Sequence, residues 1–381
     1  MAAIQKRINE VIVFTNGDSR KISTWSNVPF FFTETLISKE IVVNRVNISP
    51  NPLLQKFYNI TFLKIAKLFF RNTTFGYFRS YIHFKIVRNK IKKAIKQYPN
   101  AEALIFLTFS FSATGLTTKP IIQFGDWTYG HYFKHLAKRQ PDILEKQSIK
   151  REDAQVNGSD LILALFPKVA EYMKSRYSNK NIYYLGNVIN SSLSASMHEL
   201  LEIKKQSQNI IFIGSIKYLK GVRSLISAFD ILKSKYPSLS LHIIGINKSH
   251  LKNLAKDIHC YGYLDKGKDS ERELYYQLLN EAKLFVNPTP GWGAFSASVE
   301  AMYFYTPVVV APYDEFVETF GKEMKAGVYC RDDSKSSLAE AIEQIIDDKH
   351  YEQICINSHN AVKDFTWDSY IDKVIVKMEE F

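Results

Sequence analysis

One short segment of the chain brings a lysine to the start of a predicted helix. It reads Gly214-Ser-Ile-Lys-Tyr-Leu-Lys-Gly221 and lies between an apolar strand pattern and a helical pattern. A glycine at the end of a strand lets the backbone turn, and Lys220 then lies beside free helical N–H groups that favour an anion. The segment therefore predicts an anion-binding turn, although a solvated lysine ahead of a helix has the same pattern.

A second segment with the same organisation is Asn287-Pro-Thr-Pro-Gly-Trp-Gly-Ala-Phe-Ser-Ala-Ser-Val-Glu-Ala-Met302. A strand pattern ends in a Pro/Gly-rich loop, and small residues then open a helix. Free N–H groups near Phe295 and Ser296 suit a phosphate. Glu300 lies in the first turns of this helix, where its carboxylate could accept from a pair of ribose hydroxyls or only complement the helix dipole. The apolar residues around Glu300 favour the binding role.

The N-terminal half offers further polar candidates. Asp126 and His131 lie in the run that follows the strand pattern 120–124, and they are candidates for acceptor binding or proton handling. Their structural alternatives are helix capping for Asp126 and simple packing for His131. Asn16-Gly17-Asp18 follows the first strand pattern and resembles a loop that faces a phosphate or an acceptor, while an ordinary turn explains it equally well.

Several cofactor motifs are missing from the sequence. It contains no Asp-x-Asp, His-Glu-x-x-His or Cys-x-x-Cys, so no metal site is predicted. It also lacks the Gly-x-x-x-x-Gly-Lys-Ser/Thr loop and the dinucleotide Gly-x-Gly-x-x-Gly. We therefore expect no cofactor and no metal.

The elements that must position these residues alternate between strands and helices, which indicates an α/β fold with doubly wound parallel sheets. Strand patterns occupy residues 11–15, 41–46, 103–107, 120–124, 161–164, 181–185, 209–214, 239–245, 258–262, 284–287 and 307–311. Two long helical patterns, 52–71 and 77–97, are inserted in the first half. We expect two Rossmann-like domains that face each other across a cleft, with ligands outside the carboxyl ends of the strands.

The domain boundaries follow from the same patterns. Residues 1–187 form the predicted N-terminal domain and 188–364 the C-terminal domain, with a hinge near 186–192. Residues 365–381 form a terminal helix that crosses back to the N-terminal domain, with Asp368 as its N-cap candidate.

The two C-terminal segments, in this order and spacing, resemble the donor site of retaining GT-B glycosyltransferases of the family 4 type (glycosyl transferases group 1). The matching residues are Gly214 with Lys220-Gly221, Asn287-Pro-Thr, Glu300-Ala-Met302 and Thr306-Pro-Val-Val309. The resemblance is strong over roughly residues 205–320 and holds only in outline for the first half. It makes the C-terminal domain the nucleotide-sugar donor domain and the N-terminal domain the acceptor-binding one.

The resemblance also implies roles for single residues. It places the donor on Gly214, Ser215, Lys217, Lys220, Tyr263, Trp292, Ala294, Phe295, Ser296 and Glu300. Lys220, Asp126 and His131 become the catalytic candidates, and Asn16, Gly17 and Asp18 lie on the acceptor side. The chain departs from the family where Ser215 replaces an arginine and Trp292 replaces a glutamate. The donor sugar therefore stays open.

The basic charge is concentrated in one stretch. The net charge is +12, and residues 41–101 contain twelve cations and no acidic side chain, whereas the rest of the chain balances 38 bases with 38 acids. Aromatic residues are interleaved with these cations, which suits the anionic surface of a membrane. The alternatives are a solvated basic stripe and nucleic-acid binding, and no nucleic-acid reader motif supports the latter. Three cysteines and no apolar leader indicate the cytoplasm, with the protein peripheral on the inner face of the membrane.

These observations lead to one expected function and two alternatives. We expect a metal-independent retaining glycosyltransferase that moves a sugar from a nucleotide-diphosphate sugar to a glycan or lipid-linked acceptor in cell-envelope polysaccharide or glycolipid synthesis. A sugar-nucleotide epimerase of the same fold and a catalytically inactive glycan- or membrane-binding relative are the alternatives. An epimer formed from the donor alone would indicate the former, and the absence of turnover with any donor the latter.

Overall fold

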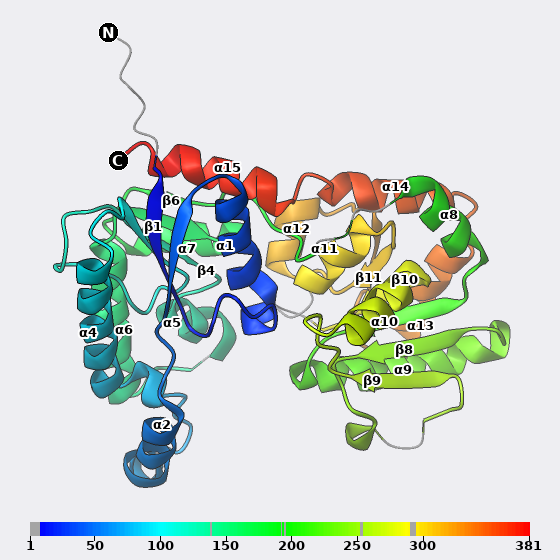
Figure 1. The fold of residues 1–381 in the computed structure, drawn as a ribbon. Helices are drawn as coiled ribbons and strands as arrows, with labels where there is room; N and C mark the ends of the chain where they lie inside the picture. Colours follow the sequence, from blue (N-terminus) through cyan, green and yellow to red (C-terminus); the bar gives the residue numbers. More distant parts are fainter. Residues whose placement is uncertain (1–7, 138, 192, 194–195, 252–253, 290–294) are drawn as a thin grey trace. The chain divides into compact units, whose positions relative to one another are not determined.

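The computed structural model describes residues 8–137, 139–191, 193, 196–251, 254–289 and 295–381. The chain divides into two compact units. Unit 1 comprises Met1–Asn187 and Trp367–Phe381, and unit 2 comprises Val188–Thr366. Both are α/β units built on a parallel six-stranded sheet, which confirms the predicted fold class (Figure 1).

The sheet of unit 1 has the order β2-β1-β3-β4-β5-β6. Its strands are β1 (Glu10–Thr15), β2 (Val42–Asn47), β3 (Ala103–Phe106), β4 (Ile121–Gly125), β5 (Leu161–Ala164) and β6 (Ile182–Tyr183). All neighbouring pairs are parallel, and the strand order reverses between β1 and β3. Ligands of open α/β sheets bind at such a reversal, outside the carboxyl ends of the strands.

The helices of unit 1 connect these strands and cover the sheet. They are α1 (Val28–Ser38), α2 (Pro52–Tyr58), α3 (Lys64–Phe69), α4 (Tyr81–Gln97), α5 (Tyr129–His131), α6 (Ile143–Asn157), α7 (Pro167–Arg176) and α15 (Trp367–Met378). Short turns of other helical types are η1 (Thr24–Asn27), η2 (Asn59–Leu63), η3 (Tyr77–Arg79) and η4 (Tyr132–Ala137).

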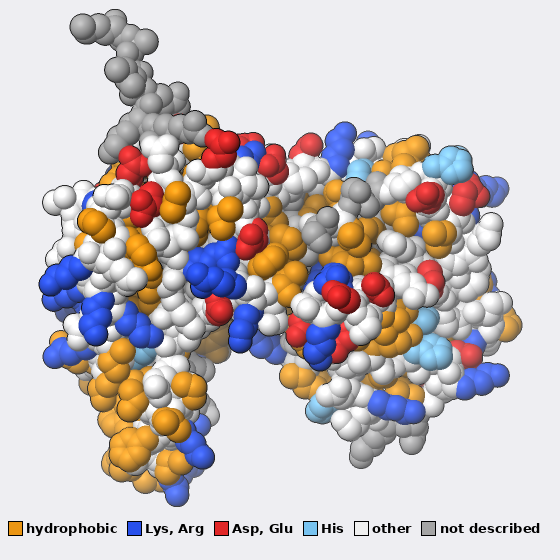
Figure 2. Space-filling model, in the orientation of Figure 1, with side chains coloured by type: hydrophobic (Ala, Val, Ile, Leu, Met, Phe, Trp, Pro, Cys, Tyr) orange, Lys and Arg blue, Asp and Glu red, His pale blue; other side chains and the backbone are white. Residues whose placement is uncertain are grey.

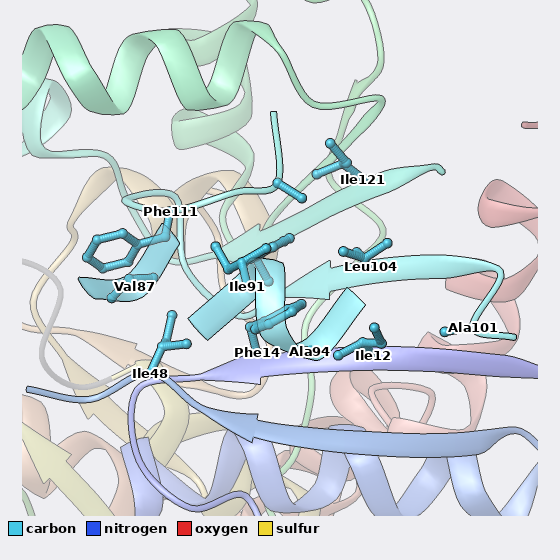
Figure 3. Packing of buried hydrophobic residues seen from close by; sticks show 12 residues of the cluster. Ile12, Phe14, Ile48, Val87, Ile91, Ala94, Ala101, Leu104, Phe111 and Ile121 are labelled. Atoms are coloured by element: carbon cyan, nitrogen blue, oxygen red, sulfur yellow. The ribbon is translucent and has the colours of Figure 1, made fainter. Parts of the chain in front are cut away.

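The packing of α4 shows how this layer forms. Val87, Ile91 and Ala94 recur at helical spacing and are buried against the side chains of Ile12 and Phe14 on β1 (Figure 3). Because one face of α4 is committed to the core in this way, four of its lysines, Lys85, Lys92, Lys93 and Lys96, are left exposed on the opposite face.

The predicted helix 52–71 differs from the observed one in its middle. A π turn, η2, separates α2 from α3. In this segment Tyr58 and Ala66 are buried. On an unbroken α-helix these two residues would lie about 80° apart. The wider π turn between them rotates less per residue and brings both towards the protein.

The terminal helix α15 packs on α1 within unit 1. Its first residue, Trp367, is buried and stacks with Phe31. The prediction of Asp368 as N-cap is wrong, because the helix already begins at Trp367 and Asp368 lies in its first turn. Its carboxylate instead pairs with the Lys39 ammonium at 2.7 Å. Within the described ranges, no helix combines the length and the apolar composition that crossing a membrane requires.

The sheet of unit 2 has the order β12-β11-β10-β7-β8-β9. Its strands are β7 (Asn209–Ile213), β8 (Ser240–Ile244), β9 (Ile258–Gly262), β10 (Ala282–Asn287), β11 (Val308–Val310) and β12 (Gly327–Tyr329). Its helices are α8 (Met197–Gln206), α9 (Leu219–Lys235), α10 (Asp269–Asn280), α11 (Phe295–Tyr303), α12 (Asp314–Phe320), α13 (Lys335–Ile346) and α14 (Tyr351–Val362), with the turns η5 (Ile216–Tyr218) and η6 (Lys248–His250). The strand order reverses between β7 and β10, which are neighbours in the sheet.

Candidate functional site

The two chemistry-bearing segments of unit 2 follow the two strands at this reversal. The first, Gly214–Gly221, leaves the carboxyl end of β7, and the second begins at Asn287, the last residue of β10. Because β7 and β10 are parallel neighbours, both segments emerge at the same edge of the sheet. The fold therefore brings them together at the position where such sheets bind ligands.

Close backbone packing shapes this edge. Gly245, which follows β8, has a φ of +94°, and a Cβ atom there would lie 2.2 Å from the carbonyl oxygen of Gly214. The Gly245 N–H donates to the carbonyl of Gly262 at 2.6 Å. A side chain at position 245 would thus push apart the ends of β7, β8 and β9.

The first segment presents its cations to solvent. Ser215 precedes the short turn η5, Lys217 lies in it, and both are exposed. Lys220 lies in the first turn of α9, with an exposed side chain that pairs with the Asp333 carboxylate at 2.7 Å. An exposed ion pair of this kind contributes about 0–1 kcal/mol, so a diphosphate can replace the carboxylate at little cost.

The second segment contains polar groups with unused hydrogen-bonding capacity. Within the described part of the chain, the buried atoms Asn287 Nδ2, Thr289 Oγ1 and Ser298 Oγ have no hydrogen-bond partner. Asn287 is fully buried, and its Oδ1 accepts from the Thr289 N–H at 3.1 Å. Buried polar groups normally have a hydrogen-bond partner. Unpaired polar atoms at the edge of the sheet where ligands bind therefore indicate hydrogen bonds that a ligand can complete. The sequence singled out Asn287 and Thr289 only as matching residues of the resemblance, without a role, and did not single out Ser298.

The other predicted residues of this segment have different surroundings. Ser296 is exposed in the first turn of α11, as a phosphate contact requires. The Phe295 ring is buried between Phe316 and Phe320, so its side chain is part of the core. Trp292 and Ala294 lie outside the described residues.

Glu300 is buried, and each carboxylate oxygen already has a partner. Oε1 accepts from Lys266 Nζ at 2.5 Å, and Oε2 accepts from the Tyr275 hydroxyl at 2.7 Å. The Lys266 ammonium also lies over the Tyr275 ring, 4.1 Å from its centroid, and donates to the Asn190 carbonyl at 3.3 Å. Burial, followed by the Glu300 charge, raises the pKa of Tyr275 well above its usual value, so its hydroxyl stays a proton donor. Sequence reasoning found Glu300 but neither Lys266 nor Tyr275.

An exposed aromatic residue follows the end of β9. Tyr263 has two thirds of its surface accessible (66%) directly after Gly262. A ring at the carboxyl edge of the sheet can stack on a planar group of a ligand, and the resemblance places Tyr263 at the donor.

In unit 1, the two candidate residues that follow β4 differ in burial and in contacts. Asp126 is half-buried, and its Oδ1 accepts from the Trp127 N–H at 2.9 Å. The cap of α5 is Thr128, whose hydroxyl accepts from the His131 N–H, so Asp126 is not the helix cap. The His131 ring is buried and stacks on His135 with centroids 4.3 Å apart. Burial, and then the neighbouring His135 and Lys134, lower the pKa of His131 to about 3, so it is neutral near pH 7 and packed rather than exposed.

The loop after β1 lines a depression of about 200 Å³ at the carboxyl ends of β1 and β2. Asn16 is exposed, the Gly17 N–H donates to Asn47 Oδ1 at 3.2 Å, and Asp18 Oδ1 accepts from the Arg20 N–H at 3.0 Å. The depression is lined by Thr15, Gly17, Asp18, Ser19, Arg20, Arg45, Val46 and Asn47. This polar depression can bind hydroxyl or anionic groups. Of its surroundings, only residues 16–18 were singled out from the sequence.

No metal-binding cluster emerges from these positions. Among the residues that the structure describes, no group of three or more His, Cys, Asp or Glu side chains is arranged to hold a metal ion.

Comparison with known proteins places these features in a family context. Residues 195–361, which include both segments at the reversal in unit 2, match the family model of Glycosyl transferases group 1. An uncharacterized glycosyltransferase of Haemophilus influenzae is 22% identical over 222 residues. The match covers 57% of this chain and 61% of that relative.

Solved structures resemble the chain over nearly its whole length. Sucrose-phosphate synthase from Thermosynechococcus elongatus has a TM-score of 0.64 at 13% identity, covering 96% of this chain and 97% of that one. HepE from Anabaena, solved in complex with UDP and glucose, has a TM-score of 0.62 at 13% identity, covering 97% and 99%. The chain therefore has the two-domain α/β fold of GT-B glycosyltransferases, and its residues 195–361 match the glycosyl transferases group 1 family.

Proposed function

We propose that the protein is a glycosyltransferase that takes its sugar from a nucleotide-diphosphate sugar bound at the carboxyl edge of the unit 2 sheet. One observation carries the proposal. The family match covers the very segments that the fold brings together at the reversal between β7 and β10. The HepE structure, which binds UDP and glucose, supports the class of donor.

In this proposal the diphosphate lies at the first turn of α9. Lys220 contributes an exposed ammonium there, and the N-terminal end of the helix dipole contributes partial positive charge. Ser215 and Lys217 are exposed just before this turn and are available to the phosphates, which matters because Ser215 stands where the family has an arginine. The ammonium and the N–H groups stabilise the charge of the leaving diphosphate, so we expect transfer to persist in the presence of a chelator.

In this proposal the Glu300 carboxylate accepts hydrogen bonds from the ribose hydroxyls and keeps the two bonds that the structure shows. A carboxylate has about four acceptor sites, and Lys266 and Tyr275 use two of them. The Lys266 ammonium donates to Glu300 Oε1 and fixes the orientation of the carboxylate. Lys266 is thus a positioning residue, and Tyr263 provides the stacking surface for the base.

The chemical step that we propose retains the configuration at the anomeric carbon. The acceptor hydroxyl oxygen forms a bond to the anomeric carbon on the face that the diphosphate leaves, while the bond from that carbon to the phosphate oxygen breaks. The electron pair of the broken bond stays with the phosphate, which takes the hydroxyl proton. No protein base is needed in this step, in keeping with the burial of His131.

For the acceptor we propose a glycan or a lipid-linked glycan of the cell envelope, built in the cytoplasm at the inner face of the membrane. The depression at the carboxyl ends of β1 and β2 supports an acceptor role for unit 1, because its polar lining suits sugar hydroxyls. Asp126, half-buried after β4, is a further acceptor contact in this proposal.

The experiment that tests the donor site compares two lysines of one helix. Nucleotide diphosphates are first screened by thermal shift, since a bound nucleotide raises the unfolding temperature. Titration calorimetry then compares wild type, Lys220→Gln and the control Lys235→Gln, which removes an exposed, ion-paired lysine from the last turn of α9. Loss of a charge-assisted phosphate bond, about 1.5–3 kcal/mol, should weaken binding roughly tenfold to hundredfold in Lys220→Gln only. Equal affinities of the two variants would show that the diphosphate lies elsewhere.

A further inference from the structure

An apolar lobe projects from unit 1. It consists of residues 52–69, that is α2, η2 and α3. Eight of its side chains are large, apolar and between 42% and 78% exposed: Leu53, Leu54, Phe57, Ile60, Phe62, Ile65, Leu68 and Phe69. The described chain has 21 exposed side chains of this kind, so more than a third are concentrated in one short segment. Figure 2 shows them as a protruding apolar surface below the rest of unit 1. Soluble proteins rarely expose such patches without a binding role.

The lobe is held firmly in place, although so little of it is buried. Tyr58 packs against Tyr77, with ring centroids 5.3 Å apart, in a small core that also contains Phe75. The returning chain is fixed by the buried Glu145 on α6, whose Oε1 accepts from the Thr74 N–H at 2.7 Å. A segment anchored in this way presents its apolar side chains permanently rather than by fluctuation.

Hydrogen bonds of an arginine complete the anchor. Arg139 donates to both carboxylate oxygens of Glu145, at 2.7 and 2.8 Å, and to the Asn72 carbonyl at 2.7 Å. A bidentate, charge-assisted pair is among the strongest hydrogen-bond arrangements in proteins. The base of the lobe is therefore tied to the main body of unit 1.

The side chains on and beside the lobe are basic, which favours an anionic partner. Lys56, Lys64 and Lys67 are exposed on the lobe, and within the described residues none of them has an ion pair. No acidic residue occurs anywhere in residues 41–101. The outer face of α4 adds Lys85, Lys92, Lys93 and Lys96, within an arc of about 100° opposite its buried face. Figure 2 shows basic side chains gathered over α4, next to the lobe.

We propose that this lobe is a membrane-docking element that inserts its apolar side chains into an anionic lipid bilayer. Apolar tips on a convex projection fit the interior of a leaflet, and unpaired lysines beside them fit anionic headgroups, with their stems along the acyl boundary. This locates the membrane contact predicted for residues 41–101 in residues 52–69, and insertion, not charge alone, provides most of the binding. The proposal does not depend on the transfer reaction.

Vesicle co-sedimentation of the full chain tests it. One set of vesicles contains phosphatidylcholine alone. The other contains phosphatidylcholine with roughly 30% phosphatidylglycerol, which represents the anionic lipid content of a membrane. Three variants are compared with wild type: an apolar variant (Leu53→Ser/Leu68→Ser/Phe69→Ser), a charge variant (Lys56→Gln/Lys64→Gln/Lys67→Gln) and a control (Met197→Ser/Ile231→Ser/Val376→Ser). The control removes exposed apolar side chains outside the lobe.

We expect wild type to bind both vesicles, and the anionic ones at least about tenfold more tightly. The affinity of the apolar variant should fall at least about tenfold for both kinds of vesicle. The charge variant should lose only the preference for the anionic vesicles. The control should bind like wild type. Failure of wild type to bind either vesicle, or unchanged binding of the apolar variant, overturns the proposal. So does a wild-type dimer in light scattering that the apolar variant converts to monomer, because the lobe would then bind a second copy.

Discussion

The buried pair of Lys266 and Glu300 gives a prediction whose size follows from the structure. Both side chains are at least nine-tenths buried, and their charged atoms lie 2.5 Å apart. Lys266→Met would leave the Glu300 carboxylate buried with only the Tyr275 hydroxyl. Removing one partner of a buried pair costs about 3–5 kcal/mol. For a unit of this size each kcal/mol lowers the unfolding temperature by roughly 2–4 °C, so unit 2 should melt about 6–20 °C lower.

A double-mutant cycle isolates the interaction. Lys266→Met/Glu300→Gln removes both charges and keeps similar volumes, so we expect it to be within about 1–2 kcal/mol of wild type, well above Lys266→Met alone. Differential scanning calorimetry of the full chain is the assay, with the transitions of the two units fitted separately because a two-unit chain is not two-state. The control is Lys268→Met, which breaks an exposed pair with Glu271 and should cost less than about 1 kcal/mol. The coupling would be refuted if the double variant loses as much unfolding free energy as Lys266→Met and Glu300→Gln lose together.

Two further predictions concern stability and the shape of the donor edge. Hydrogen bonds from Arg139, and from the Asp142 and Thr74 N–H groups, outweigh burial and lower the pKa of Glu145 to about 2 from 4.5. Its contribution, about 3 kcal/mol, is therefore fully present above pH 4.5 and is lost as the pH falls towards 2. Glu145→Gln should lower stability at pH 7 and flatten the acid unfolding curve, and a variant with the wild-type pH dependence would contradict this origin. Gly245→Ala should lower the unfolding temperature of unit 2 and weaken nucleotide binding, because the Cβ atom meets the Gly214 carbonyl and φ is +94°; a variant that binds nucleotide as wild type does would show that the edge tolerates the change.

The sequence predicted the donor edge well because its signals are local. A strand pattern, a glycine and a helical pattern in succession locate Lys220 at a helix start, and the structure has it in the first turn of α9. The position of Glu300 on α11 follows from the same kind of signal. All eleven predicted strand patterns overlap observed strands for the same reason. The short edge strand β12 has only three residues and was not predicted.

Contacts between distant parts of the chain could not be predicted in this way. Lys266 lies between the charged residues Asp265 and Lys268, where a lysine is typical of a solvated loop, yet it is buried against a carboxylate 34 residues further on. The lobe shows a second limit. A helical wheel assumes a constant turn, and the π turn η2 changes the faces of α3 relative to α2. The burial of His131 likewise depends on Tyr172 of α7, whose proximity no spacing rule indicates.

The measurement that tests the central claim most directly is hydrogen exchange of the full chain with and without a saturating nucleotide diphosphate. If the donor lies at the carboxyl edge of the unit 2 sheet, amide protection should rise in Gly214–Gly221 and in the first turns of α11, with a smaller rise after Gly262. The amides of α8, which belongs to neither segment, should be unchanged and serve as the internal control. Nucleotide binding that leaves both segments unprotected, or that protects only unit 1, would contradict the assignment of the donor site.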